Sequence, residues 1–358
     1  MIEEFFKTEK NAIDKIIDDY FNGTIREEKE IFFSDFVNQM KEFITNKKAK
    51  RIHPVLLIAA FSGIVNPLYL EDQIDQIRKI SICVELLHSG HLIHDDLIDD
   101  DETRRGKPTF HMQLRNEINQ IYKNQEIDRK EHIIGSYGRD LSILGGSFGY
   151  LLGLDVLKAS KFPEQIKLLA LNEYTEALNY LIKGQIIEEY MEHHNITMTL
   201  EQYLNIAELQ RARVFEKSTK IGSILARGNM HYQIEPLSEA MLRIGQAYAI
   251  RDDILDLEND IIGQKKKFIY ILAVQNTDEE QSKILNEVYR KTTPLNKGDI
   301  NKVADIFTET NALIIAEQFA KNLIQESKNY LKSIYPDLNK KQKTFFNEFS
   351  DFIYLREF

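Results

Sequence analysis

The chain has 358 residues, of which 43% are hydrophobic, and its formal net charge at pH 7 is −10. A chain of this length can bury a large core, and an acidic chain without a basic field falls outside the class of nucleic-acid binders. Glycine and proline number only 16 and 7, and so few helix-breaking residues favour a mostly helical protein.

The sequence carries no sign of secretion or of a membrane span. Its N-terminus, MIEEFFKTEKNAIDK, lacks the apolar core of a signal peptide. The most apolar stretch, Pro54 to Leu70, contains two prolines and polar residues, so we expect a buried helix that ends near Asn66 and no transmembrane segment. Because Cys83 is the only cysteine, we expect a cytoplasmic protein in a reducing compartment.

Helical periodicity runs through most of the chain. Apolar residues recur at three- and four-residue spacing in Phe32 to Ile44, Gln76 to His94, Leu141 to Leu157, Ile166 to Gly184 and Leu237 to Leu257. No stretch alternates in the manner of a strand. We predict an all-α fold, a helical bundle in a single domain that covers residues 1–358.

Two stretches are conspicuously polar. Arg115 to His132 reads as a surface insertion. Lys291 to Asp299 has turn chemistry at Pro294 and Gly298 and is predicted to be a loop. Neither stretch is sharp enough to mark a domain boundary.

The stretch HLIHDDLIDDDETRRGKPTFH, residues 91–111, joins a dense anionic cluster to a cationic one. On a helix, Asp95 and Asp99 lie within roughly 40° of each other, with Asp96 beside them. Like charges at this spacing repel each other, and they also oppose the helix dipole. A bound cation would relieve both costs, and oxygen ligands suit Mg²⁺ shared with substrate phosphates. The alternative is an acidic helix end in contact with solvent.

A second motif has the same DDxxD spacing. Asp252, Asp253 and Asp256 again end an apolar helical stretch. Helical bundles commonly build metal sites from carboxylates on facing helices, so we predict one paired metal site across a deep central cavity. We assign Asp95, Asp99 and Asp252 as metal ligands.

Two arginines follow the first motif. Arg104 and Arg105 offer forked donors that match phosphate. With metal-bound carboxylates beside them, they would form a clamp for a diphosphate. The alternative is that they merely neutralise the acidic run.

These motifs resemble those of the trans-isoprenyl diphosphate synthases, or polyprenyl synthetases. The first aspartate motif with its trailing RRGKPT and the second motif GQAYAIRDDILD carry the resemblance, and weaker likeness covers most of residues 40–355. It implies an isoprenoid synthase-type fold, usually in a homodimer. It also implies head-to-tail condensation of an allylic diphosphate with isopentenyl diphosphate, three Mg²⁺ ions, and release of diphosphate.

The resemblance implies roles for individual residues. The catalytic set is Asp95, Asp96, Asp99, Asp252, Asp253, Asp256 and Lys217. The substrate-binding set is Lys50, Arg51, His53, His88, Arg104, Arg105, Ser218 and Lys266. In the family, metal ions and fixed cations stabilise the charge on the leaving diphosphate, and an apolar cavity shields the allylic cation from water.

Several positions depart from the family pattern. The family's GGKRxRP reads KAKRIHP here, so two glycines are lost and His53 replaces an arginine. Because only protonated histidine carries a charge, isopentenyl diphosphate binding is expected to weaken or to depend on pH. A glutamine before the second motif is replaced by Ala249, and a threonine by Ser218. The lysine-rich loop after Asp256 is shortened, and Lys265 and Lys267 compete with Lys266 for its role.

Product length in the family depends on side chains before the first aspartate. Gly90 leaves one usual blocking position open, His91 fills part of another, and Leu87 lies one turn deeper. We therefore expect products of C20 or longer.

Two other functions stay open. A terpene cyclase, or a prenyltransferase that uses another acceptor, would share the fold, although the intact motif at Asp252 weighs against a cyclase. A non-catalytic subunit of a heteromeric synthase is the third reading, although such subunits tend to lose one aspartate motif.

Overall fold

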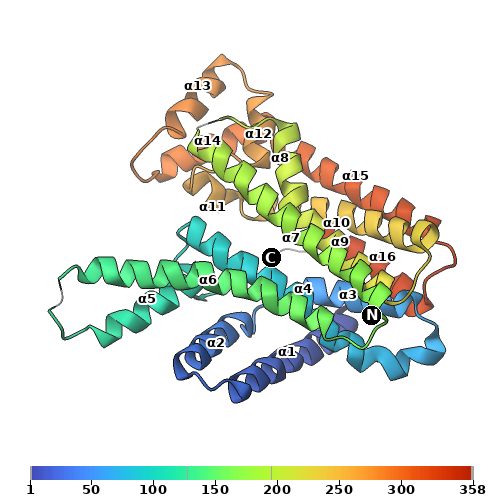
Figure 1. The fold of residues 1–358 in the computed structure, drawn as a ribbon. Coiled ribbons are helices and arrows are strands. Elements are labelled where there is room, and N and C mark those ends of the chain that lie inside the picture. The colour runs from blue at the N-terminus through green and yellow to red at the C-terminus, as the bar shows by residue number, and fades with distance from the viewer. Residues whose placement is uncertain (1, 127, 195, 356–358) are drawn as a thin grey trace. The chain divides into compact units, whose positions relative to one another are not determined.

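The computed structural model describes residues 2–126, 128–194 and 196–355. Over these residues it consists of helices and one hairpin of two-residue strands (Figure 1), which confirms the all-α prediction. The chain divides into two compact units, Met1–Leu178 with Ile221–Arg227 and Asn179–Lys220 with Gly228–Phe358. We describe each unit by itself, and the single domain expected from the sequence stays a prediction.

The first unit holds the N-terminal helices. They are α1 (Ile2–Glu27), α2 (Ile31–Ile44), α3 (Ile52–Ile64), α4 (Pro67–Ile98), α5 (Phe110–Ile121) and α6 (Lys130–Lys158), with the hairpin β1 (Thr103–Arg104) and β2 (Lys107–Pro108). The buried helix that was expected to end near Asn66 is α3, which ends at Ile64. Asn66 instead caps the next helix, α4: its side chain accepts from the Leu68 N–H at 3.0 Å, and Pro67 occupies the first turn.

Glycines let α4 and α6 pack closely. A Cβ atom on Gly90 would lie 2.6 Å from the Gly146 carbonyl oxygen, and one on Gly153 would lie 2.7 Å from the Cys83 carbonyl oxygen. His94 lies against Gly146 and contacts the Ile143 carbonyl through Nε2 at 3.0 Å. The aspartate motif at the end of α4 is therefore held by a rigid pair of helices.

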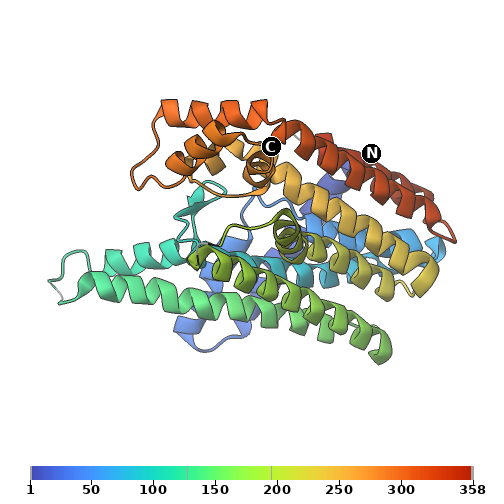
Figure 2. The ribbon, with the colours of Figure 1, turned by 90° about the horizontal axis from the view of Figure 1, so that it is seen from above.

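The expected insertion at residues 115–132 is largely helical. It comprises most of α5, the first turn of α6 and the segment between them (Figures 1 and 2). In both views α5 and α6 run side by side.

The second unit holds most of the remaining elements. They are α8 (Leu200–Ala207), the π-helices η1 (Glu208–Ala212) and η2 (Met230–Ile234), α10 (Glu235–Leu255), α11 (Leu257–Ile262), α12 (Phe268–Val274), α13 (Glu279–Val288), α14 (Lys297–Glu309), α15 (Ala312–Ser333) and α16 (Lys340–Leu355). Two helices, α7 (Glu164–His193) and α9 (Arg213–Leu225), have residues in both units.

Two local features of the second unit bear on the predictions. Gly245 of α10 lies against η1, since a Cβ atom there would come within 2.4 Å of the Ala212 Cα. The loop expected from Lys291 to Asp299 ends at Asn296, which forms a capping box with Asp299 at the start of α14.

Candidate active site

The first aspartate motif forms the C-terminal turn of α4. The Asp99 N–H donates to the Asp95 carbonyl at 2.9 Å, which places Asp99 at the C-cap. Asp96 is buried, Asp95 is half-buried and Asp99 is exposed. The helix-end position predicted for this motif is confirmed.

Arg104 holds two of these aspartates together. Its Nε donates to Asp96 Oδ1, and its Nη2 donates to Asp95 Oδ2 at 3.2 Å. Burial raises the pKa of Asp96 to about 6, although the charge of Arg104 acts in the opposite direction. Among the described residues, the second oxygen of Asp96 has no hydrogen-bond partner. A buried carboxylate with an unused oxygen fits a cation ligand.

The two arginines stand on a tight hairpin. Arg104 ends β1, and the turn that follows consists of Arg105 and Gly106, with φ of +54° and +74°. Two consecutive positive φ angles are those of a type I′ turn, which suits a two-residue hairpin. An arginine in this conformation is strained, so the turn fixes Arg105 in a definite place.

Two histidines predicted for the isopentenyl diphosphate subsite lie together. The rings of His53 on α3 and His88 on α4 are 4.7 Å apart between centroids and meet at 70°. Burial lowers the pKa of His53 to about 4. Burial also lowers the pKa of His88 well below its usual value, and the positive charge of Arg105 acts in the same direction. The structure therefore brings these two histidines within electrostatic reach of Arg105, and both are uncharged near neutral pH.

Arg51, which the resemblance assigns to substrate binding, is engaged by other parts of the protein, and its contact with substrate stays a prediction. Its guanidinium is buried and pairs with Glu85 and with Asp14, the latter at 2.7 Å. Its Nη2 donates to the Ile44 carbonyl at 2.8 Å. Every nitrogen of the guanidinium is engaged within the protein, so Arg51 joins α1, α2, α3 and α4.

Lys48, which replaces a glycine of the family pattern, lies beside the hairpin. Lys48 Nζ is 3.2 Å from the position that a Cβ atom on Gly106 would occupy. Both Lys48 and Lys50 are exposed. No ion pair of Lys48 occurs among the described residues. Its charge therefore stands next to the turn that carries Arg105.

The second aspartate motif lies at the C-terminal end of α10, as the first lies at the C-terminal end of α4. The Asp256 N–H donates to the Asp252 carbonyl at 2.9 Å, so the third aspartate again ends the helix. Asp252 accepts from Arg211 Nη1 at 3.0 Å. Arg211 lies on the π-helix η1, a rare element that often occurs at functional sites.

Asp253 is tied into the protein. It is buried, and its Oδ2 accepts from the Tyr203 hydroxyl and from the Phe268 N–H at 3.1 Å. Lys267 Nζ lies 4.0 Å from Asp253 Oδ1 and 3.0 Å from Asp260 Oδ1. Burial raises the pKa of Asp253, and Lys267 lowers it. Asp253 thus fixes the start of α12.

Lys267 contacts the second motif, with Nζ 4.0 Å from Asp253 Oδ1, whereas Lys266 is the lysine predicted from the sequence and Lys267 its competitor. The structure shows no ion pair for Lys266 among the described residues.

Lys217 and Ser218 lie inside α9. Lys217 is buried, with Nζ at 3.5 Å from Glu216 Oε1 and 5.6 Å from the Tyr180 ring centroid. Within the described part of the chain, the buried Ser218 hydroxyl has no hydrogen-bond partner. A buried cation next to an unused hydroxyl suits an anionic ligand.

The predicted product-length positions lie on α4, but Gly90 is not an open gap. A Cβ atom there would meet the Gly146 carbonyl oxygen at 2.6 Å and the Tyr150 ring at 3.1 Å. Gly90 therefore serves close packing of α4 against α6. His91 and Leu87 are buried, as expected.

Neither motif forms a complete metal site from its own side chains. Among the residues that the structure describes, no three His, Cys, Asp or Glu side chains converge as metal ligands do.

The chain was compared with protein families and with named relatives. The polyprenyl synthetase family model matches residues 34–307. A short chain isoprenyl diphosphate synthase of Methanocaldococcus jannaschii is 30% identical over 254 residues, which span 67% of this chain and 66% of that protein. A geranylgeranyl diphosphate synthase of Sulfolobus acidocaldarius is 24% identical over 350 residues, 92% of each chain.

Solved structures share the fold. A geranylgeranyl pyrophosphate synthase of Corynebacterium glutamicum, in complex with isoprenyl diphosphate and magnesium, has a TM-score of 0.83 at 21% identity and 99% coverage of each chain. A geranylgeranyl pyrophosphate synthetase of Pyrococcus horikoshii has a TM-score of 0.80 at 24% identity, again with 99% coverage of each chain. The family match, together with two DDxxD motifs that each close a helix, shows that this chain belongs to the polyprenyl synthetase family.

Proposed function

We propose that this polyprenyl synthetase condenses an allylic diphosphate with isopentenyl diphosphate head-to-tail and releases diphosphate. One observation supports the proposal above all: both DDxxD motifs lie at the C-terminal end of a helix, and an arginine donates to an aspartate of each, Arg104 in the first motif and Arg211 in the second. Relatives named geranylgeranyl and geranylfarnesyl diphosphate synthase support linear products of C20 or longer.

We propose that three Mg²⁺ ions are the cofactor. Asp95, Asp99 and Asp252 would hold them, with Asp96 offering its unused oxygen. When bound, Mg²⁺ neutralises charge on the leaving diphosphate. The magnesium in the Corynebacterium complex supports this assignment.

Fixed cations of the chain would bind the allylic diphosphate. Arg104 already bridges Asp95 and Asp96, so its forked donors are positioned beside any phosphate that these carboxylates hold through a metal. Lys217 is buried in α9, and its charge would act on the diphosphate in surroundings poor in water. Such preorganised charge stabilises the anion that develops as the carbon–oxygen bond breaks.

Isopentenyl diphosphate would bind on the other side of the hairpin. His88 and Arg105 supply donors there, together with Lys50 and His53. Because His53 is uncharged, this subsite has less positive charge than the family pattern implies. Lys48, at the Arg105–Gly106 turn, is placed to restore it.

The carbon chemistry needs an environment without water. Buried side chains of α4 such as Val84, Leu87 and Leu92 supply apolar surface on the turns before Asp95. An apolar wall shields the allylic cation until the isopentenyl double bond attacks it. The proton lost afterwards would go to the released diphosphate, so the reaction needs no side-chain nucleophile.

A homodimer is the assembly we propose. Within the described residues, α6 alone has the length and apolarity of a membrane span, and 44% of its most apolar window is buried. Leu144 and Leu151 of α6 are 60% and 57% exposed, and the Phe33 ring of α2 lies 5.4 Å from the Phe148 ring beside them. A second copy of the chain would cover this apolar face.

The buried thiol of Cys83 is compatible with the cytoplasm, the compartment we propose.

Incubation with labelled isopentenyl diphosphate and allylic primers of several lengths, followed by product chromatography, tests the function. We expect magnesium-dependent incorporation of label into linear products of C20 or longer. Label in a product that is not a linear chain of isoprene units would indicate that the enzyme uses another acceptor. Consumption of the primer alone would indicate a cyclase, and no reaction in the absence of a second protein would indicate a non-catalytic subunit.

A further inference from the structure

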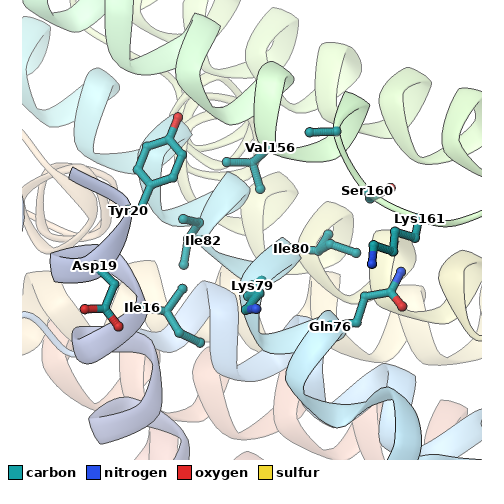
Figure 3. A pocket seen from close by; sticks show the side chains of 11 residues that line it. Ile16, Asp19, Tyr20, Gln76, Lys79, Ile80, Ile82, Val156, Ser160 and Lys161 are labelled. Carbon is teal, nitrogen blue, oxygen red and sulfur yellow. The ribbon is translucent and has the colours of Figure 1, made fainter. Parts of the chain in front are cut away.

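A pocket in the first unit lies away from the aspartate motif. It has a volume of about 540 Å³ and is formed by α1, α4 and the C-terminal end of α6 (Figure 3). α4 and α6 approach closely at Gly153, and the pocket is lined one turn later by Val156. Its α4 residues lie 13 to 19 positions before Asp95, which is about 20 to 30 Å along a helix. The pocket is therefore separate from the diphosphate-binding end of α4.

The wall of the pocket is apolar. Ile80 and Ile82 of α4 are 3% and 2% exposed, and Ile16 of α1 and Val156 of α6 complete the wall (Figure 3). Branched side chains from three helices face one space. A pocket of this size and lining takes a ligand with a hydrocarbon body.

Cations stand at the edge of this apolar wall. Lys79 and Lys161 line the pocket, are exposed, and form no ion pair among the described residues. Asp19 is the one carboxylate of the lining, so the lining carries a net positive charge. The Ser160 hydroxyl, also in the lining, is buried and lacks a hydrogen-bond partner in the described part of the chain.

We propose that this pocket is a second binding site for an isoprenyl diphosphate, with its hydrocarbon chain against the isoleucines and its diphosphate on Lys79 and Lys161. The lining pairs an apolar body with cations, which is what an amphipathic anion requires. The assignment to this ligand class rests on the proposed function, because the product of that reaction is such an anion. The site binds without metal, since its anion partners are lysines.

Calorimetric titration of the whole protein with geranylgeranyl diphosphate in EDTA tests the site. Chelation removes the metal that the aspartate motifs need, so binding at about one ligand per chain is expected to persist in EDTA, and the pocket variants below separate it from binding on the metal-free cations around Arg105. Inorganic diphosphate and geranylgeraniol, which each lack one half of the ligand, are expected to bind at least tenfold more weakly. No binding in EDTA, or equally tight binding of inorganic diphosphate, would overturn the proposal. Tighter binding of palmitate would assign the pocket to fatty acids and would also overturn it.

Variants localise the binding. Lys79→Glu with Lys161→Glu reverses the charge, and Ala159→Trp fills the space; each is expected to weaken binding at least tenfold. Lys158→Glu is the matched control, because Lys158 is exposed on the same end of α6 outside the lining. Equal binding by the double variant and the control refutes the site. Turnover of labelled isopentenyl diphosphate by the unaltered protein is scored separately, so failure of the proposed function is distinguishable from failure of the pocket.

Discussion

Single residues around the Arg105 turn determine how isopentenyl diphosphate would bind. Arg51 is engaged by Glu85 and Asp14, and His53 is uncharged at neutral pH. The charge of this subsite therefore depends on Lys50, Arg105 and the lysine beside the turn.

Lys48→Ala is expected to raise the KM for isopentenyl diphosphate about tenfold, because it removes a charge-assisted contact of about 1.5 kcal/mol. The KM for the allylic primer should change little. Lys47→Ala is the control, since Lys47 is an exposed neighbour of the same charge. Steady-state kinetics with each substrate varied in turn checks this, and equal effects of the two variants would contradict the role given to Lys48.

His53 should make isopentenyl diphosphate binding depend on pH. Its pKa is lowered to about 4 in the free protein, and a bound diphosphate would favour the protonated ring. Binding then takes up a proton, so the affinity falls as the pH rises above about 4, by at most about tenfold per pH unit. His53→Gln cannot titrate. The ratio of its KM to that of the unaltered enzyme should increase from pH 8 down to pH 5, and a constant ratio would refute a role for His53 protonation.

The contact of α4 with α6 positions the first aspartate motif. Gly90→Ala forces a Cβ atom against the Gly146 carbonyl, and overpacking of this kind costs about 1 to 3 kcal/mol. Gly135→Ala, on α6 with open space around it, should instead stabilise by about 0.5 to 1 kcal/mol. Urea unfolding measures both. A Gly90→Ala enzyme of unchanged stability with shorter products would restore Gly90 as a product-length position.

Elements with a long apolar period could be predicted from the sequence, and short ones could not. The pattern from Gln76 to His94 indicated α4, and the one from Leu237 to Leu257 indicated α10. The 103–108 hairpin was missed because strands of two residues are too short to show an alternating pattern. The π-helix η1 was missed because a π-helix of five residues has no periodicity of its own, so nothing in the local sequence pointed to Arg211 as a partner of Asp252.

Some residues of the candidate site could also be predicted from the sequence, and others could not. Carboxylates, arginines and histidines could be named from motif spacing, and the structure places His53, His88 and Arg105 near one another. The burial of Arg51 and the position of Lys48 depend on contacts between distant segments, which spacing along the chain does not report.

At the scale of the whole molecule, assembly would depend on the apolar face of α6. Leu144→Glu with Leu151→Glu should convert a dimer to a monomer in sedimentation velocity, because charges would be buried between the copies. Ile314→Glu is the control, since Ile314 is equally exposed, at 65%, on α15. A dimer that persists in the α6 variant, or dissociates in the control, would contradict this interface.

We propose that both aspartate motifs act on one diphosphate through shared magnesium. A double-mutant cycle of Asp95→Ala and Asp252→Ala, read as magnesium-dependent kcat/KM for the allylic primer, tests it most directly. Each single variant should lose about a hundredfold or more, and the double variant should lose no more than the worse single one, because the residues act as a unit. Losses that add fully in the double variant, or a single variant with normal turnover, would show that the motifs act independently.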